Sequence, residues 1–212
     1  MRLLKKIMMK LENAACLLLS FVFNRHVAAW FRRIHAKIAW NANKRGFAAV
    51  GSNTAVMPPY FLEGTEFIEI GSGFRAKRNL RLEAYWEDHR EAPPYIRIGD
   101  GVCMNYDVHI GAVRGIVIGN DVLIGSHVLI TDHNHGNSTM EMLRMKPLQR
   151  PLLTKGEVTV GNSVWIGENA VIMAGSRIGN NSIVGANTVV NGEVPDFSVA
   201  VGNPMRIIRR NE

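Results

Sequence analysis

A six-residue repeat between residues 160 and 190 restricts the fold of this chain more than any other feature of its sequence. The stretch reads VGNSVW, IGENAV, IMAGSR, IGNNSI and VGANTV: each block opens with an aliphatic residue and has Val or a small residue in fifth place. A period held over this length is an internal repeat. Three such blocks make one coil of about 18 residues, a triangular turn with a short strand on each side.

The pattern gives each position of the block a place in the coil. The opening aliphatic residues point inward and stack on those of neighbouring coils, and the fifth position also points inward, close to a corner. Gly and Asn gather at the corners because they tolerate positive φ angles. One coil buries little, whereas stacked coils share a continuous core. Short strands of an ordinary β-sandwich are the alternative, but their turns recur at about 8–12 residues rather than six.

The residues before the repeats have a different composition. Residues 1–45 contain neither Gly nor Pro and are rich in helix formers, so we expect a helical segment there and a β domain over residues 46–212. Residues 1–50 hold ten Lys or Arg and one acidic residue, which accounts for the positive net charge of +7. No nucleic-acid-binding motif accompanies these basic residues, and we expect no nucleic-acid partner.

The apolar residues of this segment predict contact with a surface. The run from Ala14 to Phe23 is ten residues long, about half the length of a bilayer span. It lacks the cleavage pattern of a signal peptide, although its basic start leaves that interpretation open. Residues 27–44 mix aromatic side chains with Lys and Arg, as helices on anionic membranes do. We therefore expect peripheral membrane association through residues 1–45; packing on the β domain or on another subunit is the alternative.

A long excursion interrupts the repeats and is the best place for a functional site. Residues 83–95 also break the pattern and should loop out, and two extra residues around 113–115 shift its register, but the longest departure covers residues 131–156. Long excursions from a rigid scaffold are usually functional. This one begins with DHNH, and histidine is the usual general base for a hydroxyl because its pKa lies near neutrality. His133 and His135 are therefore the candidate catalytic residues.

These features together resemble the hexapeptide-repeat acyltransferases, in particular the branch that O-acetylates sugars in capsule, O-antigen and exopolysaccharide biosynthesis. The resemblance covers about residues 65–210 and leaves residues 1–45 outside it. It implies an all-β fold, a left-handed parallel β-helix with an N-terminal helical segment and one long loop excursion. Besides the repeats, the segments that carry it are ITDHNHG (130–136), VWIG (164–167), AG (174–175), IVGA (183–186) and VGNPMR (201–206).

The resemblance implies a CoA-dependent O-acetyltransferase that moves an acetyl group from acetyl-CoA to a sugar hydroxyl. His133 matches the family's catalytic histidine, which takes the proton of the acceptor hydroxyl, and His135 is the close alternative. Trp165 matches the Trp beside the thioester, where a backbone donor stabilises the oxyanion; a packed corner residue is the other interpretation. Asn105 and Asp107 match a segment that contacts the acceptor sugar, although both residue types are also common at corners.

The resemblance also places small residues along the pantetheine of CoA and arginines at its phosphates. The matching positions are Ala174, Ala186, Asn191, Arg206 and Arg209. Many relatives have Thr-Lys where this chain has Asn191-Gly192, so one cation is missing from the phosphates. The family works as a homotrimer with active sites between adjacent subunits. The acceptor is then a free or a lipid-linked sugar, and no metal is expected.

Other functions fit parts of the sequence. The same scaffold serves N-acetylation of an amino sugar nucleotide or acetylation of another small acceptor. A zinc-dependent β-helix protein of the carbonic-anhydrase-like kind holds its metal with three histidines, and this chain offers His109, His127 and His133. A non-catalytic scaffold or membrane-binding module is the third alternative. The only cysteines, Cys16 and Cys103, are far apart, which indicates a reducing compartment; we expect a cytoplasmic protein, peripheral on the inner face of the cytoplasmic membrane.

Overall fold

A computed structural model describes residues 2–86 and 92–208 of this protein, the side chains of residues 2–4 and 22 excepted. The chain divides into two units, Met1–Ala39 and Trp40–Glu212. The first contains α1 (Arg2–Val22) and most of α2 (Arg25–Asn43). No helix in the described part of the chain is by itself long and apolar enough to cross a bilayer, although α1 and α2 together, as a bent pair, pass a test of length and composition.

The division falls inside α2, before residue 45, because Trp40 already packs on the second unit. Its side chain is 2% exposed, and its Nε1 donates a hydrogen bond to Thr54 Oγ1 at 2.9 Å. The ring meets those of Phe47 and Tyr60 edge-on, with centroids 5.5 and 6.2 Å away. The last turn of α2 is thus part of the β unit.

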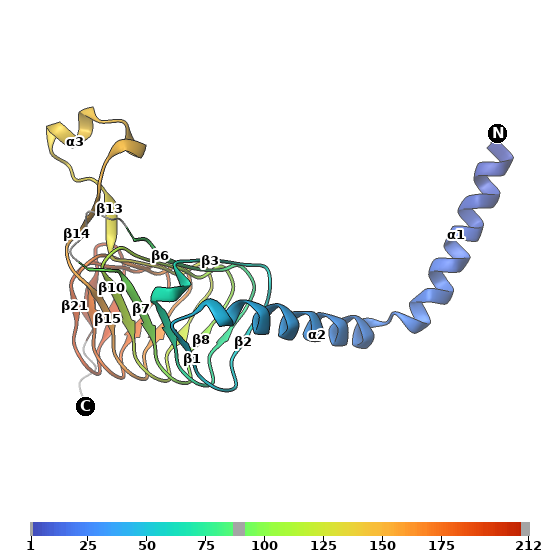
Figure 1. The fold of residues 1–212 in the computed structure, drawn as a ribbon, viewed down its shortest axis with the longest axis horizontal. Coiled ribbons are helices and arrows are strands. Elements are labelled where there is room, and N and C mark those ends of the chain that lie inside the picture. The colour runs from blue at the N-terminus through green and yellow to red at the C-terminus, as the bar shows by residue number, and fades with distance from the viewer. Residues whose placement is uncertain (1, 87–91, 209–212) are drawn as a thin grey trace. The chain divides into compact units, whose positions relative to one another are not determined.

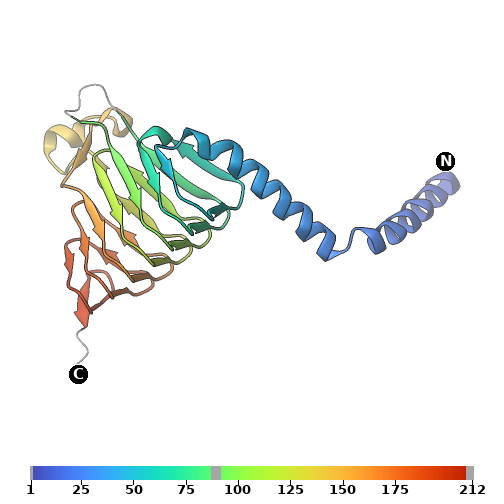
Figure 2. The ribbon, with the colours of Figure 1, turned by 60° about the horizontal axis from the view of Figure 1, so that its bottom comes forward.

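The second unit is a β-helix of three parallel sheets, A, B and C, to which the chain adds one strand each in turn (Figures 1 and 2). Sheet A contains β1 (Ala49–Val50), β4 (Ile68–Ile70), β7 (Tyr95–Ile98), β10 (Gly115–Ile118), β15 (Val158–Val160), β18 (Arg177–Ile178) and β21 (Glu193–Val194). Sheet B contains β2 (Ala55–Val56), β5 (Arg75–Ala76), β8 (Cys103–Met104), β11 (Leu123–Ile124), β16 (Trp165–Ile166), β19 (Ile183–Val184), β22 (Val199–Val201) and the antiparallel β23 (Arg206–Ile208). Sheet C contains β3 (Tyr60–Glu63), β6 (Leu80–Ala84), β9 (His109–Ala112), β12 (Leu129–Thr131), β17 (Val171–Ile172) and β20 (Val189–Val190). Two single-turn 3₁₀ helices, Lys44–Gly46 and Thr65–Phe67, precede β1 and β4.

The inward-pointing aliphatic residues of the repeat form the core, as predicted. In sheet B, for example, Met104, Ile124, Ile166 and Val184 stack on successive coils, and all are 0% exposed. Burial of each such side chain contributes about 1.5–3 kcal/mol. The regular spacing of these residues therefore determines both the shape of the coil and much of its stability.

Side chains at the corners satisfy the backbone of the preceding coil. At the corner between sheets A and B, Asn162 Oδ1 accepts from the amide of Asn120 at 2.8 Å, Asn180 Oδ1 from that of Asn162 at 2.8 Å, and Asp196 Oδ1 from that of Asn180 at 2.7 Å. Buried or half-buried amides need such partners. The ladder explains why Asn and Asp recur beside Gly in the repeat.

The outer faces of the three sheets differ in character. The outward row of sheet A is largely charged, whereas those of sheets B and C are largely apolar over the later coils. The row on sheet A is Glu69, Arg97, Val117, Thr159, Arg177 and Glu193; that on sheet B is Cys103, Leu123, Trp165, Ile183 and Val199; that on sheet C is His109, Leu129, Val171 and Val189. Sheet A therefore suits contact with water better than the other two.

The excursion is an arm built on two strands. It leaves from the corner between sheets C and A (Figure 1), and its ends, β13 (His133–His135) and β14 (Leu152–Thr154), pair antiparallel. Its tip carries α3 (Met140–Arg144) and a 3₁₀ turn, Pro147–Gln149. The earlier break in the repeat begins later than expected, because β6 continues to Ala84 and so keeps Glu83 in sheet C.

Candidate active site

The candidate base His133 lies where the arm leaves the β-helix. It opens β13 and pairs with Thr154 of β14, so the two-stranded base of the arm fixes its position. Its side chain is 12% exposed, and its ring meets the Tyr85 ring edge-on at 5.9 Å between centroids. His135 lies farther along the arm and is exposed. The structure thus distinguishes the two histidines: only His133 borders sheet C.

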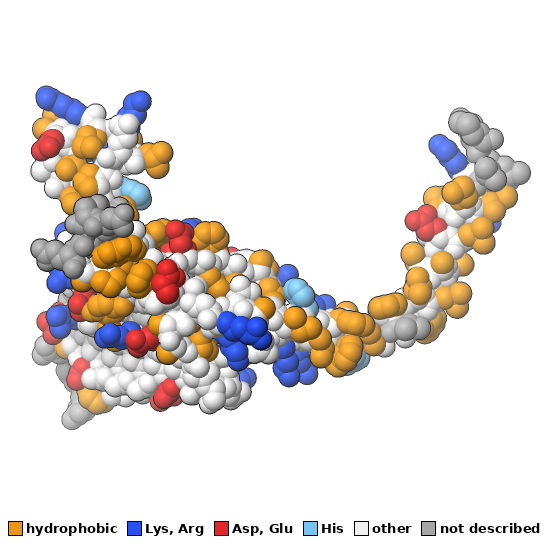
Figure 3. All heavy atoms as spheres, in the orientation of Figure 1, with side chains coloured by type: hydrophobic (Ala, Val, Ile, Leu, Met, Phe, Trp, Pro, Cys, Tyr) orange, Lys and Arg blue, Asp and Glu red, His pale blue; other side chains and the backbone are white. Residues whose placement is uncertain are grey.

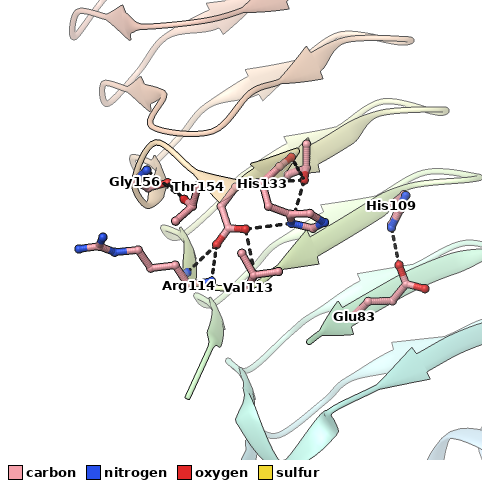
Figure 4. A network of polar contacts seen from close by, with 10 residues as sticks. Glu83, His109, Val113, Arg114, His133, Thr154 and Gly156 are labelled. Carbon is pink, nitrogen blue, oxygen red and sulfur yellow. Dashed lines mark hydrogen bonds and ion pairs between the residues drawn. The ribbon is translucent and has the colours of Figure 1, made fainter. Parts of the chain in front are cut away.

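Asp132 holds the His133 ring in place. Its carboxylate is fully buried and accepts hydrogen bonds from the backbone amides of Val113 (2.9 Å), Arg114 (2.8 Å) and Gly115 (2.7 Å) (Figure 4). Nδ1 of His133 lies 3.1 Å from Asp132 Oδ1. A proton on Nδ1 that bonds this carboxylate leaves Nε2 free to accept a proton. The extra residues that shift the repeat register at 113–115 thus supply the amides that anchor the orienting carboxylate.

A second carboxylate–imidazole pair lies beside it on sheet C. Glu83 is 1% exposed, and one of its carboxylate oxygens lies 2.6 Å from His109 Nε2 (Figure 4). The other lies 2.6 Å from Arg81 Nη2. Burial raises the pKa of Glu83, but hydrogen bonds from Arg81, Tyr85 and His109 outweigh burial, so that the pKa lies below its ordinary value. The carboxylate is therefore charged at neutral pH. His109 donates to it through Nε2, which leaves Nδ1 for another partner.

Gly111 of β9 lies between the two histidines and Tyr85 and carries no side chain that would separate them. A Cβ atom at this position would lie 3.4 Å from Cε1 of His133, 3.5 Å from Nε2 of His109 and 4.0 Å from Cε2 of Tyr85. All three side chains therefore border the volume that a larger residue would fill. An acceptor atom that packs against Gly111 from this side would approach both imidazoles.

A hollow of about 440 Å³ continues from His109 along sheet C. Phe61 lines it with a ring that is 50% exposed, and the guanidinium carbon of Arg81 lies 5.6 Å from the centre of that ring. Asp107 borders the hollow at the corner between sheets B and C, where its Oδ1 accepts from Asn79 Nδ2 at 2.8 Å. An aromatic ring with a few polar groups around it is suited to an amphipathic ring such as a sugar.

Trp165 and Asn105 occupy other parts of the coil. Trp165 lies in β16 on the outer face of sheet B, 52% exposed, between Leu123 and Ile183 of the adjacent coils. Asn105 follows β8 at the corner between sheets B and C. Within one chain, Trp165 and His133 therefore belong to different sides of the triangular coil.

The residues predicted to bind CoA are spread over two corners and one strand. Ala174 is buried at the corner between sheets C and A, and Asn191 is exposed at the same corner of the next coil. Ala186 is exposed at the corner between sheets B and C, and Arg206 is exposed in β23. Arg209 lies outside the described residues. One chain does not gather the described four into a single cleft.

Three residues of the cluster were missed in the sequence: Arg81, Glu83 and Tyr85. They belong to β6 and the residue after it, and they come near His133 because β6 stacks on β9, which in turn stacks on β12, the strand that precedes the arm. The available signal was the alternation of Arg81 and Glu83, which puts both on one face of a strand. Asp132 had a stronger signal, because it directly precedes the candidate base.

The zinc alternative finds no support in the part of the chain that the structure describes. Those residues include no group of three or more His, Cys, Asp or Glu that could hold a metal ion. His109 bonds Glu83, and His127 lies at a corner with its Nδ1 3.8 Å from an Asp107 oxygen. The three histidines considered as zinc ligands therefore lie in three different environments.

Comparison with known proteins agrees with the repeat and the fold. Residues 157–192 match the family model described as bacterial transferase hexapeptide (six repeats). The putative lipopolysaccharide biosynthesis O-acetyl transferase WbbJ of Escherichia coli K12 is 36% identical over 156 residues, which are 72% of this chain and 76% of that protein.

Two solved structures extend the comparison. The hexapeptide-repeat acetyltransferase VCA0836 of Vibrio cholerae O1 biovar eltor, complexed with acetyl-CoA, has a TM-score of 0.55 and 28% identity, and the match covers 82% of this chain and 76% of that one. AntD, an N-acyltransferase of Bacillus cereus, has a TM-score of 0.66 at 21% identity, with 81% and 88% covered, and this likeness shows the fold. The chain thus belongs to the hexapeptide-repeat transferase family and is an acyltransferase whose acyl donor is a CoA thioester.

Proposed function

We propose that this enzyme transfers the acetyl group of acetyl-CoA to a hydroxyl of a sugar during the biosynthesis of a surface polysaccharide. The observation that carries the proposal is the place of His133, which lies against the buried carboxylate of Asp132 and beside Gly111 of sheet C. The sugar acceptor is supported by the adjoining hollow with the Phe61 ring, and by similarity to WbbJ, whose name places it in lipopolysaccharide biosynthesis.

The reaction needs one group to move a proton twice. Nε2 of His133 takes the proton of the acceptor hydroxyl as that oxygen bonds the thioester carbonyl carbon, and the imidazolium then returns a proton to the departing CoA thiolate. Asp132 keeps Nδ1 protonated throughout and stabilises the positive charge that the ring gains. His109, oriented by Glu83, binds a polar group of the acceptor beside the reacting hydroxyl.

We infer that the active unit is a homotrimer of left-handed β-helices, with the site completed between subunits. The outward apolar rows of sheets B and C, with Leu123 44% and Trp165 52% exposed, are suited to burial against a neighbouring chain. Sheet B of one chain facing sheet C of the next would bring Trp165 toward His133. It would also place Ala174 and Asn191, at the corner between sheets C and A, beside sheet B of the neighbouring chain. The site of reaction is then cytoplasmic, where acetyl-CoA is available.

An acetyl-CoA thiol-release assay tests the proposal. The acceptor panel holds sugars, lipid-linked sugars and amino sugars, and His133→Ala is compared with His135→Ala as the matched control. We expect acceptor-dependent release with a hydroxylated sugar, a loss of at least about 10²-fold in His133→Ala and near-normal turnover in His135→Ala. The reverse order of the two variants would make His135 the base.

The chemistry of the product separates O- from N-acetylation. Mild alkali cleaves an acetyl ester and leaves an acetyl amide intact. An alkali-stable product formed only with amino sugars would replace the proposed reaction by N-acetylation, a reaction of the N-acyltransferase class in which AntD is named.

A further inference from the structure

The two N-terminal helices leave apolar side chains exposed along one face each. On α1, Leu11 is 66%, Leu18 70% and Phe21 75% exposed, and the spacing of 11 and 18 puts these two leucines on the same face. On α2, Phe31 is 53% and Ile38 65% exposed at the same spacing of seven. Figure 3 shows such hydrophobic side chains along both helices. In the N-terminal unit these faces have no covering partner among the described residues.

Basic side chains occupy the rest of the helix surface. On α1, the exposed Lys10 borders the face of Leu11 and Leu18, and the exposed Lys6 lies farther round the helix, toward Asn13 and Ser20 on the opposite side. On α2, the exposed basic residues are Arg25, Arg32, Arg33 and Lys37. A helix with an apolar face bordered by Lys and Arg is the form that lies in the interface of a membrane.

The charge of the molecule is concentrated in this unit. Residues 1–39 contain eight Lys or Arg and a single acid, Glu12, whereas the rest of the chain has equal numbers of basic and acidic residues. The whole net charge of +7 thus belongs to the two helices. Packing against another protein helix requires the apolar face alone, but the excess charge is complementary to anionic lipid headgroups.

We propose that residues 1–39 dock this acyltransferase on the surface of an anionic lipid bilayer, with the faces of Leu11, Leu18, Phe31 and Ile38 in the acyl-chain boundary and the lysines and arginines at the headgroups. Burial of the apolar faces contributes binding free energy in proportion to the buried area. The basic residues contribute an electrostatic attraction that weakens as the salt concentration rises. The β-helix unit, whose charges balance, contributes no net attraction of this kind.

Vesicle co-sedimentation of the full chain tests this inference without any acceptor, so the outcome does not depend on the acetyl-transfer reaction. We expect binding to vesicles of phosphatidylcholine mixed with phosphatidylglycerol, weaker binding to phosphatidylcholine alone, and release at high salt. Leu11→Gln/Leu18→Gln should weaken binding at least about tenfold, because two large apolar side chains leave the lipid. The matched control, Asn13→Gln/Ser20→Gln, puts the same residue on the polar face of α1 and should bind as the unchanged protein does.

The lysines are tested separately. Lys6→Gln/Lys10→Gln should weaken binding to the anionic vesicles about fivefold per lysine and change binding to phosphatidylcholine little. Thermal unfolding of the β-helix unit should be the same in all variants, because none of the substituted side chains belongs to it.

Four results would overturn the inference. The first is that the unchanged protein remains in the supernatant with anionic vesicles. The second is that the leucine variant binds as well as its control. Alternatively, the leucine variant would change the oligomeric state in sedimentation velocity, which would make the apolar face a contact between copies of the chain. Retention in the bilayer after an alkaline carbonate wash would replace surface docking by an embedded pair of helices.

Discussion

Replacing Gly111 by Ala tests the position of the acceptor hydroxyl with little risk to the fold. The added methyl carbon would lie 3.4, 3.5 and 4.0 Å from His133, His109 and Tyr85, which is ordinary van der Waals contact, and the Gly111 backbone lies outside the left-handed region. At a compatible position, Gly→Ala stabilises a protein by about 0.4–1 kcal/mol through the unfolded chain. We therefore expect a folded variant with a denaturation midpoint equal to or slightly above that of the parent.

The same methyl group would project beside the His133 ring and crowd the place proposed for the reacting hydroxyl. A displacement of about 1 Å from the base costs on the order of 10²-fold in rate, equivalent to about 2.7 kcal/mol of transition-state stabilisation. We expect kcat/KM for the sugar to fall by this amount, while the dissociation constant of acetyl-CoA, measured by calorimetry, stays unchanged. A well-folded Gly111→Ala enzyme with normal kcat/KM would refute the placement of the hydroxyl between the two imidazoles.

Three further substitutions address the second dyad, the CoA phosphates and the core. Glu83→Gln should destabilise the protein by about 1–3 kcal/mol at pH 7 in urea unfolding, because three donors lose a charged acceptor. Since folding lowers the pKa of Glu83, this contribution is present above the ordinary pKa near 4.5 and is lost as the pH falls through the folded value. A destabilisation by Glu83→Gln that did not decrease as the pH is lowered from 4.5 would contradict this. Arg206→Ala should raise the KM for acetyl-CoA several-fold and leave the acceptor KM nearly constant; an unchanged CoA affinity would remove this arginine from the phosphate site. Ile124→Ala should cost about 2–5 kcal/mol, because its side chain is fully buried between coils, and a loss below 1 kcal/mol would show that the core relaxes around the cavity.

The hexapeptide pattern was sufficient to predict the coil because every repeat makes the same contacts with its neighbours. The blocks from Val160 to Val190 correspond to successive strands of sheets A, B and C, with the opening residues inside. The helical character of residues 1–45 and the excursion at 131–156 were likewise visible, since both replace the repeat with another pattern. Local composition does not show that the two ends of the excursion pair as antiparallel strands, so this pairing was not predicted.

The sequence pointed to both His133 and His135 and, through the family resemblance, favoured His133; the tertiary structure shows how the surroundings of the two differ. His133 meets Tyr85, and its ring borders the space over Gly111, whereas His135 is exposed. This difference depends on coil stacking, which sets residues about 20–50 positions apart in the chain side by side.

By itself, then, the sequence determined the repeat, the core positions, the basic amphipathic start and the histidines at the base of the arm, because each is encoded in residues close together in the chain. The tertiary structure decided that Asp132 is anchored by the amides of residues 113–115, that Glu83 is buried against His109, and that Trp165 lies on a different sheet. These relations join separate coils or separate faces. No local pattern specifies them, because they arise only when the coils stack in register.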